Sequence, residues 1–221
     1  MRVYHFLSCE FGLKDIRERR LKIASFESVN DPFELLPICA DADERRRFKA
    51  ARVDMSKAIG LLCFSKDWSN PVQWSHYAEG HKGLCLGLDI PDDALTEVRY
   101  RRRRLKANWA ALNGTTHQRH AELRRWFATK FVHWEYEREM RAFLILKNFP
   151  PDTDGRRYVP FDHETRLAEV IIGDRSDLTG PDIDDALGDL SSTVHVFKAR
   201  LAFQTYRVVR QKSNRVWTRK V

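Results

Sequence analysis

The sequence predicts an α+β fold: a single domain spanning residues 1–221, with a central mixed, mainly antiparallel sheet flanked by helices. Three observations predict it. Short apolar runs of strand character alternate with charged segments of helical period. No repeat or linker interrupts them, and 221 residues with 43% hydrophobic side chains suffice to bury a core without a disulfide or metal.

The expected elements follow in chain order. Apolar runs predict strands at residues 3–7, 21–24, 59–64, 84–90, 97–100, 158–161, 167–173 and 193–203. Helical spacing predicts helices at residues 11–19, 43–59, 72–78, 104–133 and 180–190, the fourth interrupted near residue 113. A turn is expected at residues 30–34, because Asn, Asp and Pro favour turns, and a glycine-bounded break at residues 80–83.

The long helical region and the segment after it carry many aromatic side chains. Its expected buried side consists of Trp109, Leu112, Leu123, Trp126, Phe127 and Phe131. Trp74, on the short helix at 72–78, is expected to be a core residue that anchors that helix.

No segment approaches the roughly 20 apolar residues of a membrane-spanning helix. The first eleven residues lack the pattern of a secretory signal, so we expect a cytoplasmic protein with no membrane partner. The four cysteines are widely spaced and form no CxxC pair, and Cys63 and Cys85 are expected to be buried free thiols.

The net charge of +8 and the sequence pI near 9.5 favour an anionic partner, either a nucleotide or a nucleic acid. The densest basic run is Arg101–Arg104, followed by Lys106 and preceded by Tyr100. Such a run can neutralise phosphates beside a stacking aromatic ring, and it can equally be a solvated turn.

Three groups of residues in the first half of the chain are candidate ligand contacts. Tyr4 and His5 lie together on the first strand, and Asn30 and Asp31 lie in the predicted turn. The third set surrounds the short helix and the glycine-bounded turn that follows it: His76, Tyr77, His81 and Lys82.

A run of alternating charges suggests a further constellation. A period of two would place Glu135, Glu137 and Glu139 on one strand face, with Arg141 following. Such a face is either an exposed one balanced by arginines or a site able to bind a metal, act as a general base or hold sugar hydroxyls. By contrast, His117 and His120 lack a third ligand nearby in sequence and read as a solvated helix face, so no metal site is assigned.

Several motifs, taken in order, resemble the bacterial domain-of-unknown-function family twenty-nine seventy-one. They are Tyr4-His5-Phe6, Asn30-Asp31-Pro32-Phe33-Glu34, Cys63-Phe64-Ser65, Trp74-Ser75-His76-Tyr77-Ala78 with Gly80-His81-Lys82-Gly83, Trp134 with Glu137, Glu139 and Arg141, and Val170-Ile171-Ile172-Gly173. The resemblance covers nearly the whole chain, and the family name carries no activity.

The order of His5, Tyr77 and Glu139 is also similar to that of the ADP-ribosyltransferase fold, which has a split sheet. This resemblance implies NAD as a substrate, with His5 on the ribose, Tyr77 on nicotinamide and Glu139 on a ribose hydroxyl. Glu137 competes with Glu139 for the last role. A carboxylate there would stabilise an oxocarbenium-like state as the glycosidic bond breaks.

The leading hypothesis is therefore an NAD-dependent ADP-ribosyltransferase-like enzyme, a bacterial toxin or phage-defence effector acting on nucleic acid or protein, with a possible antitoxin or associated protein. One alternative is a non-catalytic nucleic-acid-binding module that uses Arg101–Arg104, Lys106 and the basic C-terminal stretch. Another is a metal-dependent phosphoesterase that uses Asp31, Glu34 and the glutamate strand.

Overall fold

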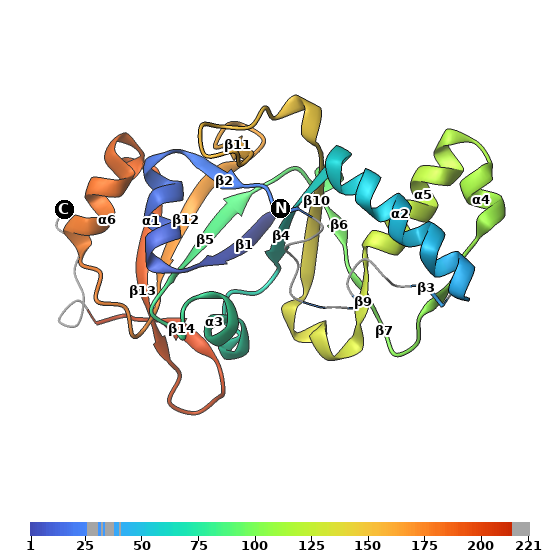
Figure 1. The fold of residues 1–221 in the computed structure, drawn as a ribbon. Coiled ribbons are helices and arrows are strands. Elements are labelled where there is room, and N and C mark those ends of the chain that lie inside the picture. The colour runs from blue at the N-terminus through green and yellow to red at the C-terminus, as the bar shows by residue number, and fades with distance from the viewer. Residues whose placement is uncertain (26–30, 32, 34–37, 40, 214–221) are drawn as a thin grey trace. The chain divides into compact units, whose positions relative to one another are not determined.

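The fold is that of a computed structural model, which describes residues 1–25, 31, 33, 38–39 and 41–213 (Figure 1). The chain divides into two compact units. Unit 1 comprises Met1–Lys22, Phe64–Asp92 and Tyr158–Val221, and unit 2 comprises Ile23–Cys63 and Asp93–Arg157. The single domain spanning residues 1–221 stays a prediction.

Unit 1 is built on a sheet whose strands come from both the N-terminal and the C-terminal parts of the chain. Its elements are β1 (Arg2–Leu7), α1 (Cys9–Arg17), β2 (Arg20–Lys22), the end of β4 (Ile59–Ser65), α3 (Pro71–Tyr77), β5 (Leu84–Asp89), β11 (Tyr158–Pro160), β12 (Arg166–Ile172), α6 (Gly180–Leu187), η4 (Gly188–Ser192), β13 (His195–Leu201) and β14 (Val208–Arg210). The strand order is β14, β13, β12, β5, β1 and β4. β12 and β13 are parallel, whereas β1 with β5, β5 with β12 and β13 with β14 are antiparallel. The predicted α+β class with a mixed, mainly antiparallel sheet is confirmed.

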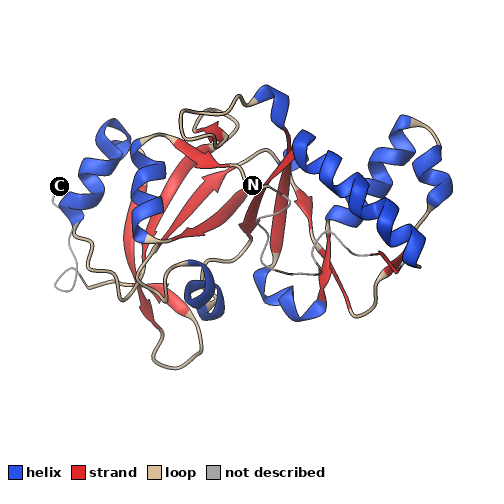
Figure 2. Cartoon of the chain, viewed as in Figure 1, coloured by secondary structure: helices blue, strands red, loops and turns tan. Residues whose placement is uncertain are grey.

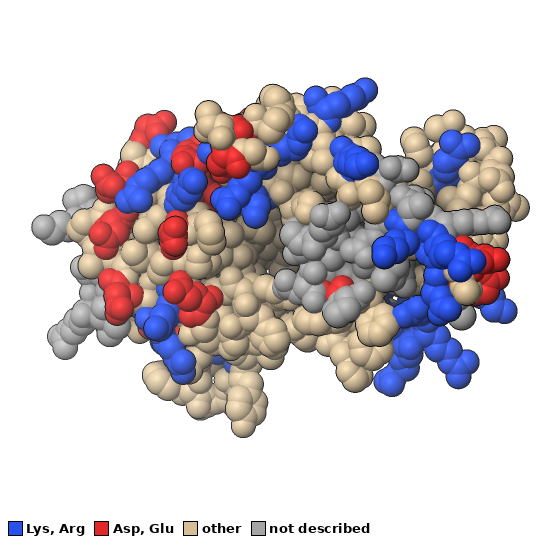
Figure 3. All heavy atoms as spheres, in the orientation of Figure 1, with Lys and Arg blue, Asp and Glu red and all other residues tan. Residues whose placement is uncertain are grey.

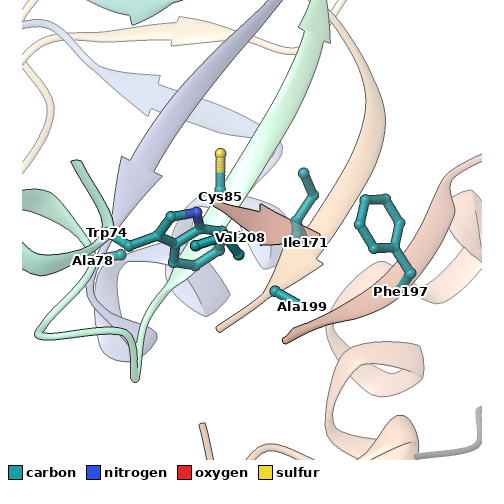
Figure 4. Close-up of a cluster of buried hydrophobic side chains, with 7 residues drawn as sticks. All are labelled: Trp74, Ala78, Cys85, Ile171, Phe197, Ala199 and Val208. Carbon is teal, nitrogen blue, oxygen red and sulfur yellow. The ribbon is translucent and has the colours of Figure 1, made fainter. Parts of the chain in front are cut away.

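Helices cover both faces of this sheet. A Cβ atom on Gly12 of α1 would clash with the Leu84 side chain, so α1 packs closely on that face of β5. The next residue, Cys85, points to the opposite face and packs with Trp74 of α3 in a buried hydrophobic cluster (Figure 4). The prediction that Trp74 is a core residue is confirmed, since its side chain is fully buried and its indole N–H donates to the carbonyl of Trp68 at 2.6 Å.

Unit 2 combines short strands with a group of helices (Figure 2). Its elements are β3 (Ile38–Cys39), α2 (Ala42–Ala58), the first part of β4, η1 (Asp92–Ala94, which begins in unit 1), β6 (Thr96–Glu97), β7 (Arg99–Arg101), β8 (Leu105–Lys106), α4 (Trp109–Asn113), α5 (Thr116–Phe127), β9 (Thr129–Phe131), η2 (Val132–Glu137), β10 (Glu139–Ile145) and η3 (Leu146–Asn148). In the sheet, β10 lies between β4 and the two-residue strand β6. Two parallel pairs, β7 with β9 and β3 with β8, hold the segment between β7 and β8.

The helices of unit 2 begin at clear capping residues and bury aromatic rings. Asp41 and Glu44 form a capping box at the start of α2, and Thr115 does the same for α5 with Gln118. Trp126 of α5 packs against Phe48 of α2 with ring centroids 5.4 Å apart. These contacts explain why the charged α2 helix is held in place despite its narrow apolar stripe.

The interruption predicted near residue 113 is confirmed, whereas the predicted extent of the helical region, residues 104–133, is wrong. The chain forms two shorter helices, α4 and α5, preceded by strand β8 and followed by strand β9. Ala128 ends α5 because its backbone leaves the helical region, and the sequence Thr129–Phe131 then pairs with β7. Trp109 and Phe131 were expected to be buried, and they are 37% and 42% exposed.

Among the described residues, none of the helices has both the length and the apolar character needed to cross a lipid bilayer.

Candidate functional site

The candidate site in unit 2 begins with four consecutive arginines, Arg101–Arg104, which we call the arginine loop. Strand pairing anchors both ends of this loop. β7 ends at Arg101, which pairs with Phe131 of β9, and β8 begins at Leu105, which pairs with Ile38 of β3. All four arginine side chains are exposed. The backbone pairing therefore presents four cations on one anchored segment.

None of the four arginines has a carboxylate partner among the described residues. The arrangement is costly for the free protein, because like charges on neighbouring positions repel each other. Figure 3 shows lysine and arginine side chains gathered on the surface around β7. Such a patch is suited to an anion that several guanidinium groups contact together.

A cavity of about 220 Å³ opens beside the arginine loop. Its lining consists of Phe33, Arg101, Arg102, Arg103, Arg104, Thr129, Lys130 and Phe131. The Arg104 guanidinium lies 4.9 Å from the centroid of the Phe33 ring, so the cation and the ring face each other. The cavity thus combines aromatic walls with a cationic rim.

Lys130, which lines the cavity, belongs to a buried group of charges with Glu137, Glu139 and Arg141, which we call the charge cluster. The Lys130 ammonium donates to Glu137 at 2.6 Å and to Glu139 at 3.2 Å. Arg141 is fully buried and donates to Glu139 through Nε at 2.7 Å and through Nη2 at 3.0 Å. Two cations and two carboxylates balance one another, as a buried ionic group requires.

Burial dominates the electrostatics of the charge cluster. It raises the pKa of Glu139 to about 7, an effect that Lys130 opposes and Glu137 reinforces. Burial likewise lowers the pKa of Arg141 to about 9, although Asp31 acts in the opposite direction. Both shifts move toward the neutral forms, because an apolar interior disfavours each charge.

Hydrogen bonds to β7 and to the end of α5 hold the charge cluster in place. The Glu139 backbone N–H donates to the Tyr100 hydroxyl oxygen at 2.8 Å, and Arg141 donates to the carbonyl of Phe127 at 2.5 Å. Burial raises the pKa of the Cys63 thiol well above its ordinary value, and the neighbouring Glu139 adds to this effect. Cys63 and Cys85 carry free thiols as predicted, and Cys85 is fully buried, whereas Cys63 is only partly buried.

Asp31 connects the charge cluster to the wall of the cavity. It is 4% exposed, and its Oδ1 accepts from the backbone N–H of Phe33 at 2.9 Å. Its charge also stabilises the protonated form of Arg141. Its Oδ2 has no hydrogen-bond partner among the described residues.

The predicted face of three glutamates on one strand is wrong. Glu135 and Glu137 lie in the 3-10 helix η2, and Arg138 adopts a left-handed backbone with φ of 46° before β10 begins at Glu139. The period-of-two count therefore does not apply across this segment. Glu137 and Glu139 still meet through Lys130, whereas Glu135 is exposed.

The predicted contacts on the first strand lie in unit 1. Burial raises the pKa of Tyr4 to about 12, and Glu169 contributes to the rise. His5 packs edge-on against Phe64, with ring centroids 5.7 Å apart. Tyr4 and His5 are both partly buried on β1 and, as adjacent strand residues, point to opposite faces.

The helix α3 and the turn after it hold the remaining unit 1 candidates. The rings of His76 and Tyr77 lie 6.0 Å apart, and His76 and Lys82 are exposed. His81 is buried, and its Nδ1 lies 2.9 Å from an oxygen of Asp174. A carboxylate in this position orients the imidazole.

The predicted site residues thus divide between the two units. His5 and Tyr77 belong to unit 1 and Glu139 belongs to unit 2, so their convergence stays a prediction. Lys106 lies on β8, exposed, directly after the arginine loop. Asn30 and Glu34 lie outside the described residues.

Within the described part of the chain, no three His, Cys, Asp or Glu side chains are grouped as a metal ion would require. The phosphoesterase hypothesis, which includes Glu34, stays a prediction.

Comparisons with known proteins do not narrow the function. No family model matches the chain, and no curated protein or solved structure matches it either. The resemblances to family twenty-nine seventy-one and to the ADP-ribosyltransferase fold therefore stay predictions.

Sequence reasoning missed Lys130 and Phe131 as site residues. Both were included in the long predicted helix, whereas they lie on strand β9. The available signal was Thr129-Lys130-Phe131, which contains a β-branched and an aromatic residue directly after the helix pattern ends. Asp174 was also missed, because nothing in sequence links it to His81 across 93 positions.

Proposed function

We propose that unit 2 binds nucleic acid through the phosphate backbone, with the arginine loop as the contact surface. The observation that carries this proposal is the exposure of four adjacent arginines that have no carboxylate partner among the described residues. A phosphate backbone supplies regularly spaced negative charges, and guanidinium groups bind phosphate oxygens bidentately. The net charge of +8 adds attraction over longer distances.

The test is the salt dependence of binding to a labelled single-stranded oligonucleotide, measured by fluorescence anisotropy. Each neutralised phosphate contributes about 0.7 to the slope of log affinity against log salt for a single strand. The double substitution Arg102→Ser/Arg103→Ser should therefore reduce the magnitude of the slope by about 1.4 and weaken binding at low salt.

A matched control removes the same charge elsewhere in unit 2. Arg124 on α5 and Lys147 on η3 are both exposed and lie outside the cavity lining. The variant Arg124→Ser/Lys147→Ser should keep most of the slope. Equal losses in the two double variants would show that net charge, and not the arginine loop, governs binding.

We propose a second candidate, the NAD-dependent ADP-ribosyltransferase, on one observation. The Lys130 ammonium brings Glu137 and Glu139 together, at 2.6 Å and 3.2 Å, and a carboxylate beside a breaking glycosidic bond can stabilise the positive charge that develops there. Because Glu139 is 5% exposed and bound by Lys130 and Arg141, this activity requires the charge cluster to open toward a ligand.

Nicotinamide release from NAD tests this candidate. Glu139→Gln should abolish release, whereas Glu135→Gln, an exposed neighbour on η2, should leave the rate unchanged. Circular dichroism of both variants separates lost chemistry from lost folding. Release that persists in a folded Glu139→Gln protein would contradict the assignment.

A further inference from the structure

The cavity beside the arginine loop has features that binding to the phosphate backbone of a nucleic acid does not require. Phe33 is 58% exposed and Phe131 is 42% exposed, although both are large apolar rings. Exposed aromatic rings next to cations form the arrangement in which bases stack while phosphates are neutralised.

The register of β7 and β9 sets the spacing between ring and cation. Phe131 lies directly opposite Arg101 in the parallel pair, so the two side chains leave neighbouring strands side by side. Arg104 faces Phe33 at 4.9 Å in the same cavity. Phe33 thus has a guanidinium group over its ring, and Phe131 lies in register with an arginine of the neighbouring strand.

The size of the cavity restricts what enters it. A volume of about 220 Å³ is below the range of about 300–1,000 Å³ typical of sites for drug-sized ligands. One planar ring is therefore a better fit than a whole dinucleotide. Two aromatic rings, Phe33 and Phe131, belong to the lining, and the charge of Lys130, which also lines the cavity, is neutralised by Glu137 and Glu139.

From these features we infer that the site takes single-stranded nucleic acid, with one unpaired base in the cavity between Phe33 and Phe131 and the flanking phosphates on the arginine loop. This inference rests on the proposed function and adds the class of strand to it. A duplex keeps its bases stacked and paired, so a base would first have to be flipped out at a cost in free energy.

The experiment compares three probes of equal length, about 10 nucleotides, by fluorescence anisotropy. They are a single strand, the duplex made from it and an abasic single strand that retains only sugar and phosphate. The single strand should bind about 10-fold more tightly than either of the other two, because only it offers an accessible base.

Substitutions of one ring test the role of stacking. Phe131→Ala should weaken binding of the single strand about 10-fold and leave binding of the abasic strand unchanged, whereas Phe131→Trp should retain affinity. Phe203→Ala removes a ring in unit 1 that is 91% exposed and should have no effect. Thermal unfolding of each variant confirms that the fold is retained.

The outcomes separate this inference from the proposed function. Equal affinity for single strand, duplex and abasic strand, with salt dependence retained, would overturn the base-in-cavity inference alone. An unchanged affinity of Phe131→Ala for the single strand would do the same. Loss of salt-dependent binding to all three probes would overturn the proposed function and the inference with it.

Discussion

Arg141 holds the charge cluster together, since it is fully buried and donates two hydrogen bonds to Glu139 and one to the carbonyl of Phe127. Removing one partner of a buried ionic group leaves an uncompensated charge in the interior. Arg141→Met should therefore lower the free energy of unfolding by about 3–5 kcal/mol in urea denaturation. Arg99→Met, at an exposed position of β7, should change it by less than about 0.5 kcal/mol. Similar effects of the two substitutions would contradict the role of Arg141.

Asp15 makes the stability of the protein depend on pH. Burial in α1 raises its pKa from 3.8 to about 7, and Glu18 adds to the rise. The folded state therefore holds this proton more tightly than the unfolded state, so the stabilisation is complete below pH 4 and is lost as the pH rises through about 7.

The substitution Asp15→Asn tests this dependence. At pH 8 the variant should be more stable than the wild type by about 1–3 kcal/mol, and the difference should disappear at low pH. Unfolding in urea between pH 4 and pH 8 measures it. A stability difference that does not change with pH would exclude Asp15 as the titrating group.

At the scale of elements, the like charges of the arginine loop suit it to bind an anion but lower the stability of the unliganded protein. Its arginines repel one another between two short parallel pairs, β7 with β9 and β3 with β8. Arg102→Ser/Arg103→Ser should accordingly raise the free energy of unfolding of the unliganded protein by about 0.5 kcal/mol at low salt. The gain should vanish at about 1 M salt, where the charges are screened. Thermal unfolding at two ionic strengths provides the measurement, and a loss of stability at low salt would contradict the repulsion.

The elements that sequence patterns predicted well are those with strong local signals. The apolar strands β4 and β5 and the capped helix α2 were expected within a few residues of their bounds. The segment from β8 to η2 was not, because the pairings of β8 with β3 and of β9 with β7 depend on partners far away in the chain. Pairing with a distant strand can override the local helix propensity of such a short segment.

At the scale of the whole molecule, the division into two units bears on the single-domain prediction. The strand β4 belongs to both units, with its residues up to Cys63 in unit 2 and Phe64 and Ser65 in unit 1. We expect one cooperative thermal transition, because unfolding either unit would disrupt this strand. Calorimetry should give a calorimetric enthalpy equal to the van't Hoff enthalpy, and two resolved transitions would show separate domains.

The candidate site was predictable only in part. The arginine run was visible as a charge cluster, and Glu137, Glu139 and Arg141 were visible as close neighbours in sequence. Their environment was not, since the same residues could have formed an exposed, solvated face. In the structure, the Lys130 ammonium binds Glu137 and Glu139, so these carboxylates are buried and their charges are compensated.

By itself, the sequence determined the α+β class, the main apolar strands and the basic character of the chain, because these follow from local periodicity and composition. Only the tertiary structure decided that Phe33, Arg104, Lys130 and Phe131 line one cavity and that Lys130 binds Glu137 and Glu139. The physical reason is that a cavity and a buried ion pair are made by residues distant in the chain, and their formation depends on strand pairing and desolvation that no local pattern records.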